Sequence, residues 1–269
     1  MTASLEKLTP TTLVTGCTGG IGREIVDLLA AQGHTLVLVS RDRAKLDALA
    51  REITDAHHVG THVIVADLAQ PGSAKAVFDA TNERGIAIDI LVNNAGIGMY
   101  GRVADIDVAA QTSMVLLNSV TPSELCAYYA DGMRKRGRGK ILNIASTVAY
   151  QPCPFMAAYG ASKAFLLSYS EALAKELEGS GVTVTAISPG PTKTEFFARL
   201  DPSVDSIDHF AGGKRHEPRR VAEIAVAAMN AGRLSKVVGV KNFILSSSSR
   251  FAPRSLTARI SKSLLSPRS

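Results

Sequence analysis

Tryptophan is absent from the 269 residues, and all aromatic residues together make up only 5%. A core must therefore be built from Val, Ile, Leu and Ala, as is usual where helices pack on a buried parallel sheet. Only three cysteines occur, Cys17, Cys126 and Cys153, widely spaced and without a C-x-x-C pair, so neither a disulfide scaffold nor a metal site is expected. No apolar run approaches the ~18 residues that span a bilayer, and residues 1–10 lack a signal-peptide core. We expect a cytoplasmic protein.

Acidic residues are missing after Glu223, whereas eight Lys and Arg residues follow it. Residues 1–223 carry 22 basic and 24 acidic groups, so the formal net charge of +6 belongs to the C-terminal part. Nucleic-acid binding is not expected from so localised a charge. With 46% hydrophobic and 20% charged residues, the chain has enough apolar material for a globular core, which excludes wholesale disorder.

Short β-branched runs alternate with longer amphipathic stretches, the pattern of parallel strands joined by crossover helices. This predicts an α/β fold with a doubly wound, mostly seven-stranded parallel sheet and helices on both faces. We expect strands at 12–15, 35–39, 62–66, 88–92, 140–145, 182–187 and 236–240. We expect helices at 20–32, 43–54, 73–84, 108–135, 157–178 and 218–231.

The domain organisation predicted is one catalytic domain over residues 1–245, with a substrate lid at about 192–217, followed by a basic amphipathic extension at 246–269. In the extension, Leu256, Ile260 and Leu264 recur every four residues, with Arg254, Arg259 and Lys262 around the rest of a helix. Such a stripe fits an anionic membrane surface or an acidic partner, and equally packing on its own domain or a sister subunit.

A glycine-rich turn, T-G-x-x-x-G-I-G, spans Thr15 to Gly22 between the first strand and the first helix. Glycines at this junction allow a tight turn, a close approach of the backbone to a pyrophosphate, and close packing of helix on strand. The helix N-terminus adds free N–H groups and a positive dipole end. We therefore predict dinucleotide binding on a Rossmann-type fold, with contacts from Gly16, Thr18, Gly20, Ile21 and Gly22.

The second strand ends in Ser40-Arg41 rather than in an acidic residue. A carboxylate there would bond the adenosine ribose and repel a 2′-phosphate. Ser40 removes that repulsion, and Arg41, assisted by Arg43, can pair with the phosphate, so NADP(H) is favoured over NAD(H), which stays a second option. The alternative is that Ser40-Arg41-Asp42 is a solvated cap of the next helix.

Ser146, Tyr159 and Lys163 are the candidate reacting groups. Tyr159 and Lys163 are four residues apart on a predicted helix, which places phenol and ammonium on one face. A fixed ammonium, together with an oxidised nicotinamide ring, would favour the phenolate of Tyr159, which could then exchange a proton with a substrate oxygen. Ser146, at a strand end, could orient that oxygen while a hydride moves to or from the cofactor. A tyrosine and a lysine at this spacing also occur by chance in many helices.

These motifs, with N-N-A-G at Asn93–Gly96 and Pro189-Gly190, resemble those of the classical short-chain dehydrogenase/reductase family over roughly residues 10–240. The resemblance implies an NAD(P)-dependent alcohol dehydrogenase or carbonyl reductase in which Tyr159 is the acid/base, Lys163 holds the ribose and lowers the pKa of Tyr159, and Ser146 steadies the substrate. It also implies that Asn118 belongs to a proton relay at a kink in the long fourth helix. Many NADP-using relatives carry a basic residue before the middle glycine of the turn, where this chain has Gly19.

The same resemblance assigns further positions to the cofactor cleft. Asp67, in Asp67-Leu68, matches the acid that contacts adenine, although it could be an ordinary strand-end cap. The remaining cleft positions are Asn94, Ala95, Gly96, Pro189, Gly190, Thr192 and Thr194, the threonines doubling as candidate helix caps.

The resemblance implies substrate contacts from the segments that vary most within the family, which here are 97–101, 148–156 and 192–213. They hold many of the chain's large apolar side chains: Met99, Tyr100, Tyr150, Cys153, Phe155, Met156, Phe196, Phe197, Leu200 and Phe210. An apolar or acyl-type carbonyl substrate is favoured, while packing in the core or a lid would use the same residues.

Three hypotheses of function follow. The first is an NADP(H)-dependent oxidoreductase that interconverts a ketone or aldehyde and an alcohol. The second is a non-catalytic NADP-binding sensor or scaffold of the same fold, and the third a peripheral lipid-interacting protein. A homodimer or homotetramer through the long fourth and fifth helices is what the resemblance implies.

Overall fold

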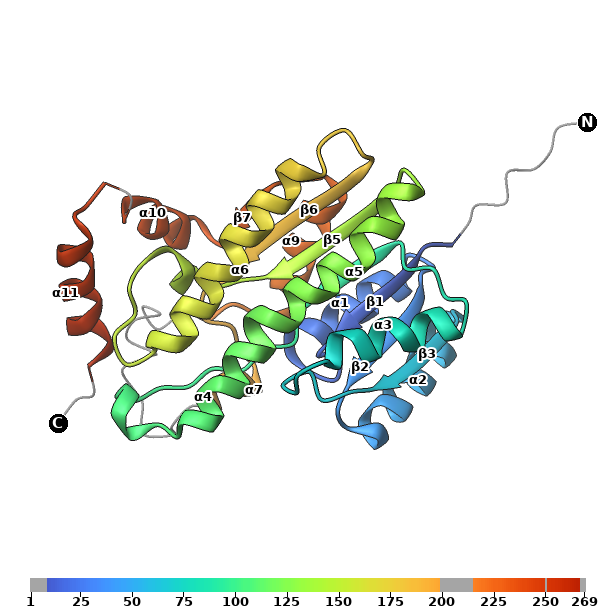
Figure 1. Ribbon diagram of the computed structural model, residues 1–269, viewed down its shortest axis with the longest axis horizontal. Helices are drawn as coiled ribbons and strands as arrows, with labels where there is room; N and C mark the ends of the chain where they lie inside the picture. The colour runs from blue at the N-terminus through green and yellow to red at the C-terminus, as the bar shows by residue number, and fades with distance from the viewer. Residues whose placement is uncertain (1–8, 199–214, 250, 267–269) are drawn as a thin grey trace, which may run out of the picture.

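The computed structural model describes residues 9–198, 215–249 and 251–266. A seven-stranded sheet in the order β3-β2-β1-β4-β5-β6-β7 runs through its middle, and every strand pairing is parallel (Figure 1). The strands are β1 Thr11–Thr15, β2 Thr35–Ser40, β3 Thr61–Val65, β4 Ile90–Asn93, β5 Gly139–Ile144, β6 Val182–Ser188 and β7 Ser235–Val237. The predicted doubly wound parallel sheet is confirmed.

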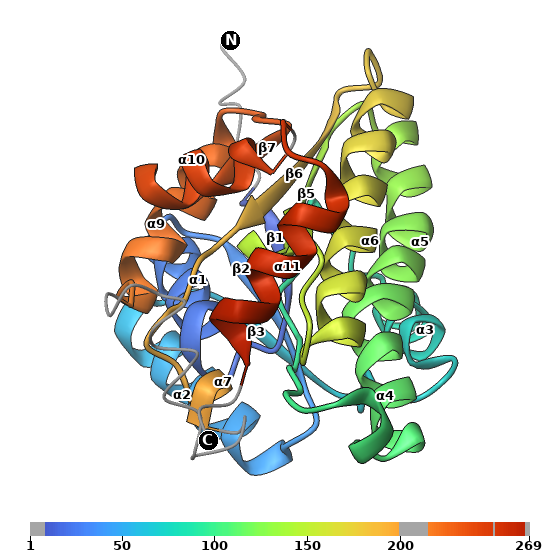
Figure 2. The ribbon, with the colours of Figure 1, turned by 90° about the vertical axis from the view of Figure 1, so that its left-hand side faces the viewer.

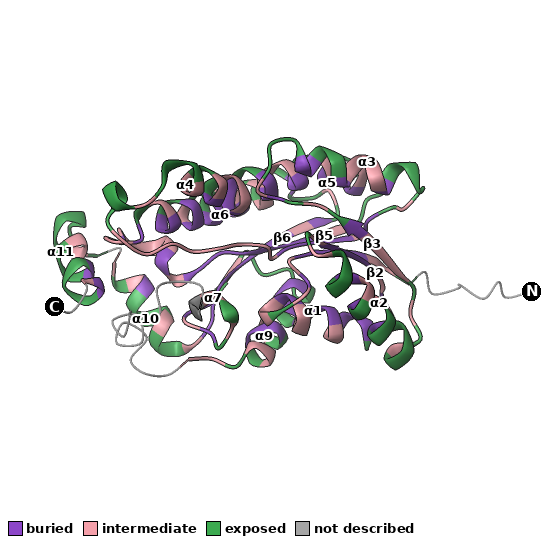
Figure 3. Cartoon of the chain, turned by 90° about the horizontal axis from the view of Figure 1, so that it is seen from below, coloured by how far each residue is buried: buried purple, intermediate pink, exposed green. Residues whose placement is uncertain are grey.

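Helices cover both faces of the sheet (Figure 3). One layer holds α1 Gly20–Ala30, α2 Arg43–His57 and α9 Pro218–Asn230; the other holds α3 Ser73–Glu83, α4 Val108–Val115, α5 Thr121–Lys135 and α6 Ala157–Glu176. The remaining elements are η1 Val103–Asp105, η3 Thr147–Tyr150, α7 Glu195–Ala198, α10 Val240–Ser248 and α11 Arg254–Leu265. None of the helices described is long and apolar enough to cross a membrane.

The sheet is apolar on both faces because neighbouring strand residues point to opposite sides. Val14 and Leu38 join the core cluster of α1 and α9, whereas Leu13 and Val37 join the cluster that includes α5. This is why the strands are continuous apolar runs instead of alternating ones. The strand order reverses between β1 and β4, which opens a crevice at the carboxyl ends of the strands.

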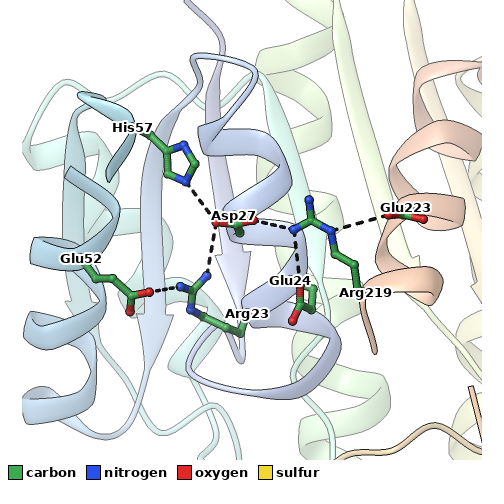
Figure 4. A network of polar contacts seen from close by, with 7 residues as sticks. All are labelled: Arg23, Glu24, Asp27, Glu52, His57, Arg219 and Glu223. Carbon is green, nitrogen blue, oxygen red and sulfur yellow. Dashed lines mark hydrogen bonds and ion pairs between the residues drawn. The ribbon is translucent and has the colours of Figure 1, made fainter. Parts of the chain in front are cut away.

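An ion-pair network joins α1 to α2 and α9 (Figure 4). Asp27 of α1 accepts hydrogen bonds from His57 of α2, at 3.0 Å, and from Arg219 of α9. Arg23 pairs with Glu52, while Arg219 also reaches Glu24 and Glu223. The network therefore fixes three helices of one layer against each other.

Two sequence expectations are wrong in detail. The helix expected over 108–135 is interrupted by a π-helical turn, η2 Leu116–Val120, which separates α4 from α5. The strand expected over 236–240 ends at Val237, because Gly239 has a positive φ of 92° and α10 begins at Val240. The expected division of the chain after residue 245 thus falls inside α10.

Candidate active site

A cavity of about 750 Å³ lies at the carboxyl ends of the strands and gathers segments from along the chain. Eighteen of the predicted site residues line it: Gly16, Thr18, Gly20, Ile21, Ser40, Arg41, Asp67, Leu68, Asn94, Ala95, Gly96, Ser146, Tyr159, Lys163, Pro189, Gly190, Thr192 and Thr194. Gly22, Arg43 and Asn118 do not. The lid predicted at 192–217 is described only at its ends, since residues 199–214 lie outside the described part of the chain.

The glycine turn is shaped by close backbone contacts. Gly16 has a φ of 63°, and a Cβ there would lie 2.8 Å from the Cα of Ala95. A Cβ on Gly22 would lie 2.4 Å from the carbonyl oxygen of Gly16 and 2.3 Å from Nδ2 of Asn94. That amide donates hydrogen bonds of 3.0 Å to the carbonyls of both Thr15 and Gly16. Gly22 is therefore a packing glycine beneath the turn.

The N-terminus of α1 opens toward the cavity. Its N-cap is Gly19, no described side chain caps it, and its first turn has no acidic residue. The first N–H groups of the helix and the positive end of its dipole are therefore available to an anion. Gly19, Gly20 and Ile21 all line the cavity at this end.

At the far end of the cavity lie two cationic side chains, Arg41 and Lys45. Arg43 is directed elsewhere, since its Nε donates to Asp47 at 2.8 Å on the exposed face of α2. Sequence reasoning missed Lys45, which lies in the first turn of α2. Thr18 and Ser40 lie beside these cations, with their hydroxyl oxygens 3.4 Å apart.

Asp67 combines the two roles that the sequence left open. Its carboxylate accepts hydrogen bonds of 3.1 Å from the backbone N–H of Ala69 and from the side chain of Gln70, as a cap does. It also lines the cavity, next to Leu68. Capping orients the carboxylate, so the two roles are compatible.

Tyr159 and Lys163 lie buried on α6, facing Ser146 at the end of β5. Burial raises the pKa of Tyr159 to about 12, and a hydrogen bond with Ser146 opposes the rise. Burial lowers the pKa of Lys163 to about 8. The lowered pKa expected for Tyr159 from Lys163 together with an oxidised nicotinamide ring stays a prediction, while the protein's own groups raise this pKa. The ammonium instead donates a hydrogen bond of 2.8 Å to the carbonyl of Ile144.

Asn118 is fully buried in the π-helical turn, behind the cavity wall. Its amide forms two hydrogen bonds with the backbone of Ile97, accepting from the N–H at 3.1 Å and donating to the carbonyl at 2.8 Å. It also donates to the hydroxyl of Ser162 on α6, at 3.2 Å. A Cβ on Gly96 would lie 3.1 Å from Oδ1 of Asn118 and 3.3 Å from Nζ of Lys163. Gly96 therefore keeps the asparagine and the lysine close together.

The other wall of the cavity is the loop after β6. Thr192 is buried and donates to the carbonyl of Gly190 at 2.9 Å. Lys193 and Pro191 exchange backbone hydrogen bonds of 2.9 Å with His216, which anchors the loop. A Cβ on Gly190 would lie 2.3 Å from Nδ2 of Asn242 on α10.

The end of the cavity beside Tyr159 is apolar. The ring of Phe196 lies 5.4 Å from that of Tyr159, centroid to centroid, and Leu265 of α11 packs in the same cluster. The cluster also contains the predicted substrate residues Met99, Tyr100, Cys153, Phe155 and Met156.

Not every predicted substrate residue is placed there. Tyr150 instead faces Ser188, with their oxygens 3.3 Å apart, and packs in a separate cluster. Leu200, Phe210 and the side chain of Phe197 lie outside the described part of the chain. Leu265 was missed by sequence reasoning, because its residue type alone does not tell which side of the terminal helix faces the cavity.

Comparisons with known proteins identify the family of this chain. A family model for short chain dehydrogenases matches residues 10–205. The chain is 35% identical to the 7beta-hydroxysteroid dehydrogenase of Collinsella aerofaciens over 182 residues, 68% of each chain. It is 34% identical over 200 residues to the very-long-chain 3-oxoacyl-CoA reductase of Anas platyrhynchos, covering 72% of this chain and 63% of that one.

A solved structure of a short-chain dehydrogenase is also similar to this chain. The short-chain dehydrogenase from Sphingobium yanoikuyae in complex with NADPH has a TM-score of 0.79 and 32% identity, covering 90% of this chain and 93% of that one. The chain belongs to the short chain dehydrogenase family, as the motifs predicted, and is an oxidoreductase.

Proposed function

We propose that this protein is an NADP(H)-dependent oxidoreductase that interconverts an apolar ketone or aldehyde and the corresponding alcohol. The observation that carries the proposal is that one cavity holds a glycine turn at a helix N-terminus, a cationic end, and the Ser146, Tyr159 and Lys163 set. The apolar cluster beside Tyr159 marks the substrate end. The non-catalytic alternative has no observation in its favour.

The residues present fit a nicotinamide dinucleotide. The cradle at Gly16 and Gly22 leaves no room for side chains, and the open N-terminus of α1 suits a pyrophosphate. Arg41 and Lys45 suit a 2′-phosphate, and Ser40 is uncharged. Asp42 also lines the cavity, and its carboxylate caps α2 by accepting from the N–H of Lys45. The NADPH in the related structure from Sphingobium yanoikuyae supports this preference.

The bound cofactor would supply or accept the hydride at the carbonyl carbon. The chain's own residues would handle the substrate oxygen. Ser146 would donate a hydrogen bond to it, and the hydroxyl of Tyr159 would give or take its proton. Because the pKa of Tyr159 is raised to about 12, the protonated phenol that carbonyl reduction requires is the form present at neutral pH.

Lys163 and Asn118 would support Tyr159 from behind. The pKa of Lys163, lowered to about 8, lies near neutrality, so this amine can pass a proton as well as hold a charge. Asn118 fixes the chain beside Gly96 through its two bonds to Ile97, next to Nζ of Lys163. This matches the relay role that the family resemblance assigns to Asn118.

The substrate end favours bulky apolar molecules. Val148, Met156, Phe196 and Leu265 line it, with Ser146 and Tyr159 as the polar groups next to them. The names of two relatives indicate a hydroxysteroid and a very-long-chain 3-oxoacyl-CoA, and the steroid and the acyl chain are likewise large and apolar. We therefore place the substrate in the class of bulky ketones.

The expected homo-oligomer stays a proposal that the surface supports. Val115 at the end of α4, Val120 in the π-helical turn and Phe165 on α6 are exposed apolar side chains in the helix layer that the family resemblance names. A second copy that packs on this layer would cover them.

The proposed activity is tested by following NADPH oxidation at 340 nm with a panel of ketones and aldehydes that differ in bulk. We expect turnover with bulky apolar ketones, and a loss of at least ~10³-fold in Tyr159→Phe with NADPH affinity retained. Activity that survives in Tyr159→Phe would contradict the mechanism. NADPH binding without turnover across the whole panel would instead favour the sensor hypothesis.

A further inference from the structure

The two C-terminal helices expose most of their large apolar side chains and bury only three residues, Ser246, Ser261 and Leu265. In α10, Phe243, Ile244 and Leu245 are 57%, 59% and 63% exposed, whereas Ser246 is 3% exposed. In α11, Ile260 is 51% exposed and Ser261 only 3%. A helix that packs on its own domain normally has the opposite arrangement. The outward faces are therefore built for contact with something apolar.

Exposed apolar residues are concentrated in this part of the chain. Of the fifteen large exposed apolar side chains in the described residues, eight lie between residues 240 and 264: Val240, Phe243, Ile244, Leu245, Phe251, Leu256, Ile260 and Leu264. We call these eight residues the C-terminal apolar surface. Both helices lie at one end of the molecule, beyond the carboxyl ends of the strands (Figures 1 and 2). Phe251, between them, is 90% exposed. A patch of this kind on a soluble domain marks an interaction site.

The inward side chains hold the helices in place. Asn242 of α10 donates to the carbonyl of Val238 at 2.8 Å, and Ser249 donates to the carbonyl of Tyr150 at 3.0 Å. In α11, Leu265 is buried in the cluster around Tyr159. The outward orientation is thus fixed by contacts on the opposite side of each helix.

The charge of the segment is of one sign. Lys241, Arg254, Arg259 and Lys262 belong to the two helices, and the sequence has no acidic residue after Glu223. If two copies met through this surface about a two-fold axis, their basic residues would face each other. Anionic headgroups above an apolar layer complement both the basic and the apolar side chains.

We infer that α10 and α11 rest on an anionic membrane surface, with the C-terminal apolar surface inserted at the level of the headgroups and acyl chains and the basic side chains among the headgroups. Leu265, on the inner side of α11, lines the cavity, so the docked helix would separate the cavity from the bilayer. This arrangement brings a substrate that dissolves in lipid close to Tyr159.

The test is co-sedimentation of the full chain with vesicles of phosphatidylglycerol and phosphatidylcholine, and with vesicles of phosphatidylcholine alone. We expect binding to the anionic vesicles that weakens as salt is raised, and much weaker binding to the zwitterionic ones. Arg259→Glu/Lys262→Glu should lower the partition coefficient roughly tenfold or more. Phe243→Ser/Ile244→Ser should lower it at least several-fold.

Matched controls change the same chemistry elsewhere. Arg134→Glu/Lys135→Glu on α5 alters the net charge equally, and Val65→Ser/Val103→Ser removes two exposed apolar side chains outside the C-terminal segment. Both controls should bind within about twofold of the wild type. On the unaltered chain, amides of residues 240–266 should exchange more slowly with vesicles present, a readout that does not depend on any variant.

Three outcomes would overturn the inference. The first is no binding to anionic vesicles. The second is equal binding by the wild type and both C-terminal variants, without slower exchange at 240–266. The third is a change of oligomeric state in the C-terminal variants, measured by light scattering, while vesicle binding is unaltered, which would assign the surface to a second copy of the chain.

Discussion

The hydroxyl of Tyr100 donates a hydrogen bond of 2.5 Å to the backbone carbonyl of Leu265, 165 residues further along the chain. The Leu265 side chain is buried in the same cluster as Tyr159. Leu265, four residues before the last residue of the sequence, therefore forms part of the wall of the candidate active site. The C-terminal helix belongs to the site as well as to the surface.

Leu265→Ala should loosen α11 and enlarge the substrate end of the cavity. Truncation of a buried leucine costs about 2–5 kcal/mol, and here the loss falls first on the docking of one terminal helix. We expect faster amide exchange over residues 254–265 and a KM for bulky ketones that rises several-fold, with kcat less affected. Leu264→Ala, which truncates the exposed neighbour, should change neither quantity, and equal effects in both variants would contradict the assignment.

Arg41→Ala and Lys45→Ala should each weaken NADPH binding while leaving NADH binding nearly unchanged. A charge-assisted hydrogen bond contributes about 1.5–3 kcal/mol, so each variant should raise the KM for NADPH by roughly 10- to 100-fold. Steady-state kinetics with both cofactors measures the ratio. Arg43→Ala is the matched control, because that side chain pairs with Asp47 outside the cavity. An unchanged preference in Arg41→Ala would refute the NADP(H) assignment.

Lys163→Met should alter how stability depends on pH. Burial lowers the pKa of Lys163 in the folded chain from 10.5 to about 8, so between these values the unfolded chain binds the proton and the folded chain does not. Keeping the buried ammonium protonated therefore costs the wild type stability below pH 8, and this cost is relieved as the pH rises through the window. A methionine carries no charge and has no such cost. The difference in unfolding free energy between wild type and variant should shift by at least about 1.4 kcal/mol from pH 7.5 to 10.5, in favour of the wild type.

Denaturant titrations across that range measure the shift. A difference that stays constant with pH would mean that Lys163 is solvated in the folded chain. Lys163→Met also removes the hydrogen bond to the Ile144 carbonyl, but it does so at every pH, so this loss cannot produce a difference that changes with pH.

Asp27→Asn should weaken the network that joins α1, α2 and α9. Burial acts to raise the pKa of Asp27, but hydrogen bonds from Arg219 and His57 outweigh it and lower the pKa below its usual range. The stabilisation is therefore present at neutral pH and is lost as the pH falls through the lowered pKa. We expect the variant to lose about 1 kcal/mol at pH 7, and the difference to shrink below pH 4.

The matched control is Asp47→Asn, which breaks the pair with Arg43 on the exposed face of α2. An exposed pair of this kind contributes at most about 0.5 kcal/mol. A loss at Asp27 no larger than that at Asp47 would show that the network adds nothing beyond single surface pairs.

Local sequence signals predicted the parts of the fold that depend on short stretches of chain. Apolar runs bounded by glycines located all seven strands to within a few residues, although β7 ends earlier than expected at Val237. The π-helical turn at 116–120 was not predicted as an element, since Leu116 to Val120 read as ordinary helix. The family resemblance had already singled out Asn118 and a kink in this helix, and the structure adds its hydrogen bonds with Ile97 and Ser162.

For the candidate site as well, sequence predicted the local motifs but not the contacts between distant residues. Residue types and their spacing singled out the glycine turn and the set of Ser146, Tyr159 and Lys163. Spacing could not show how strongly burial raises the pKa of Tyr159 or that the Lys163 ammonium points to the Ile144 carbonyl. Arg43 and Lys45 show the same limit, since two cations two residues apart on a helix face different surroundings.

The sequence by itself determined the family of this oxidoreductase and its candidate reacting groups, because the glycine turn and the spacing of Tyr159 and Lys163 are local motifs. The tertiary structure decided which side chains share a cavity, that Leu265 closes it, and that the apolar sides of α10 and α11 face outward. These features depend on contacts between residues far apart in the chain, and the same helical pattern would suit either orientation until the neighbouring elements are in place.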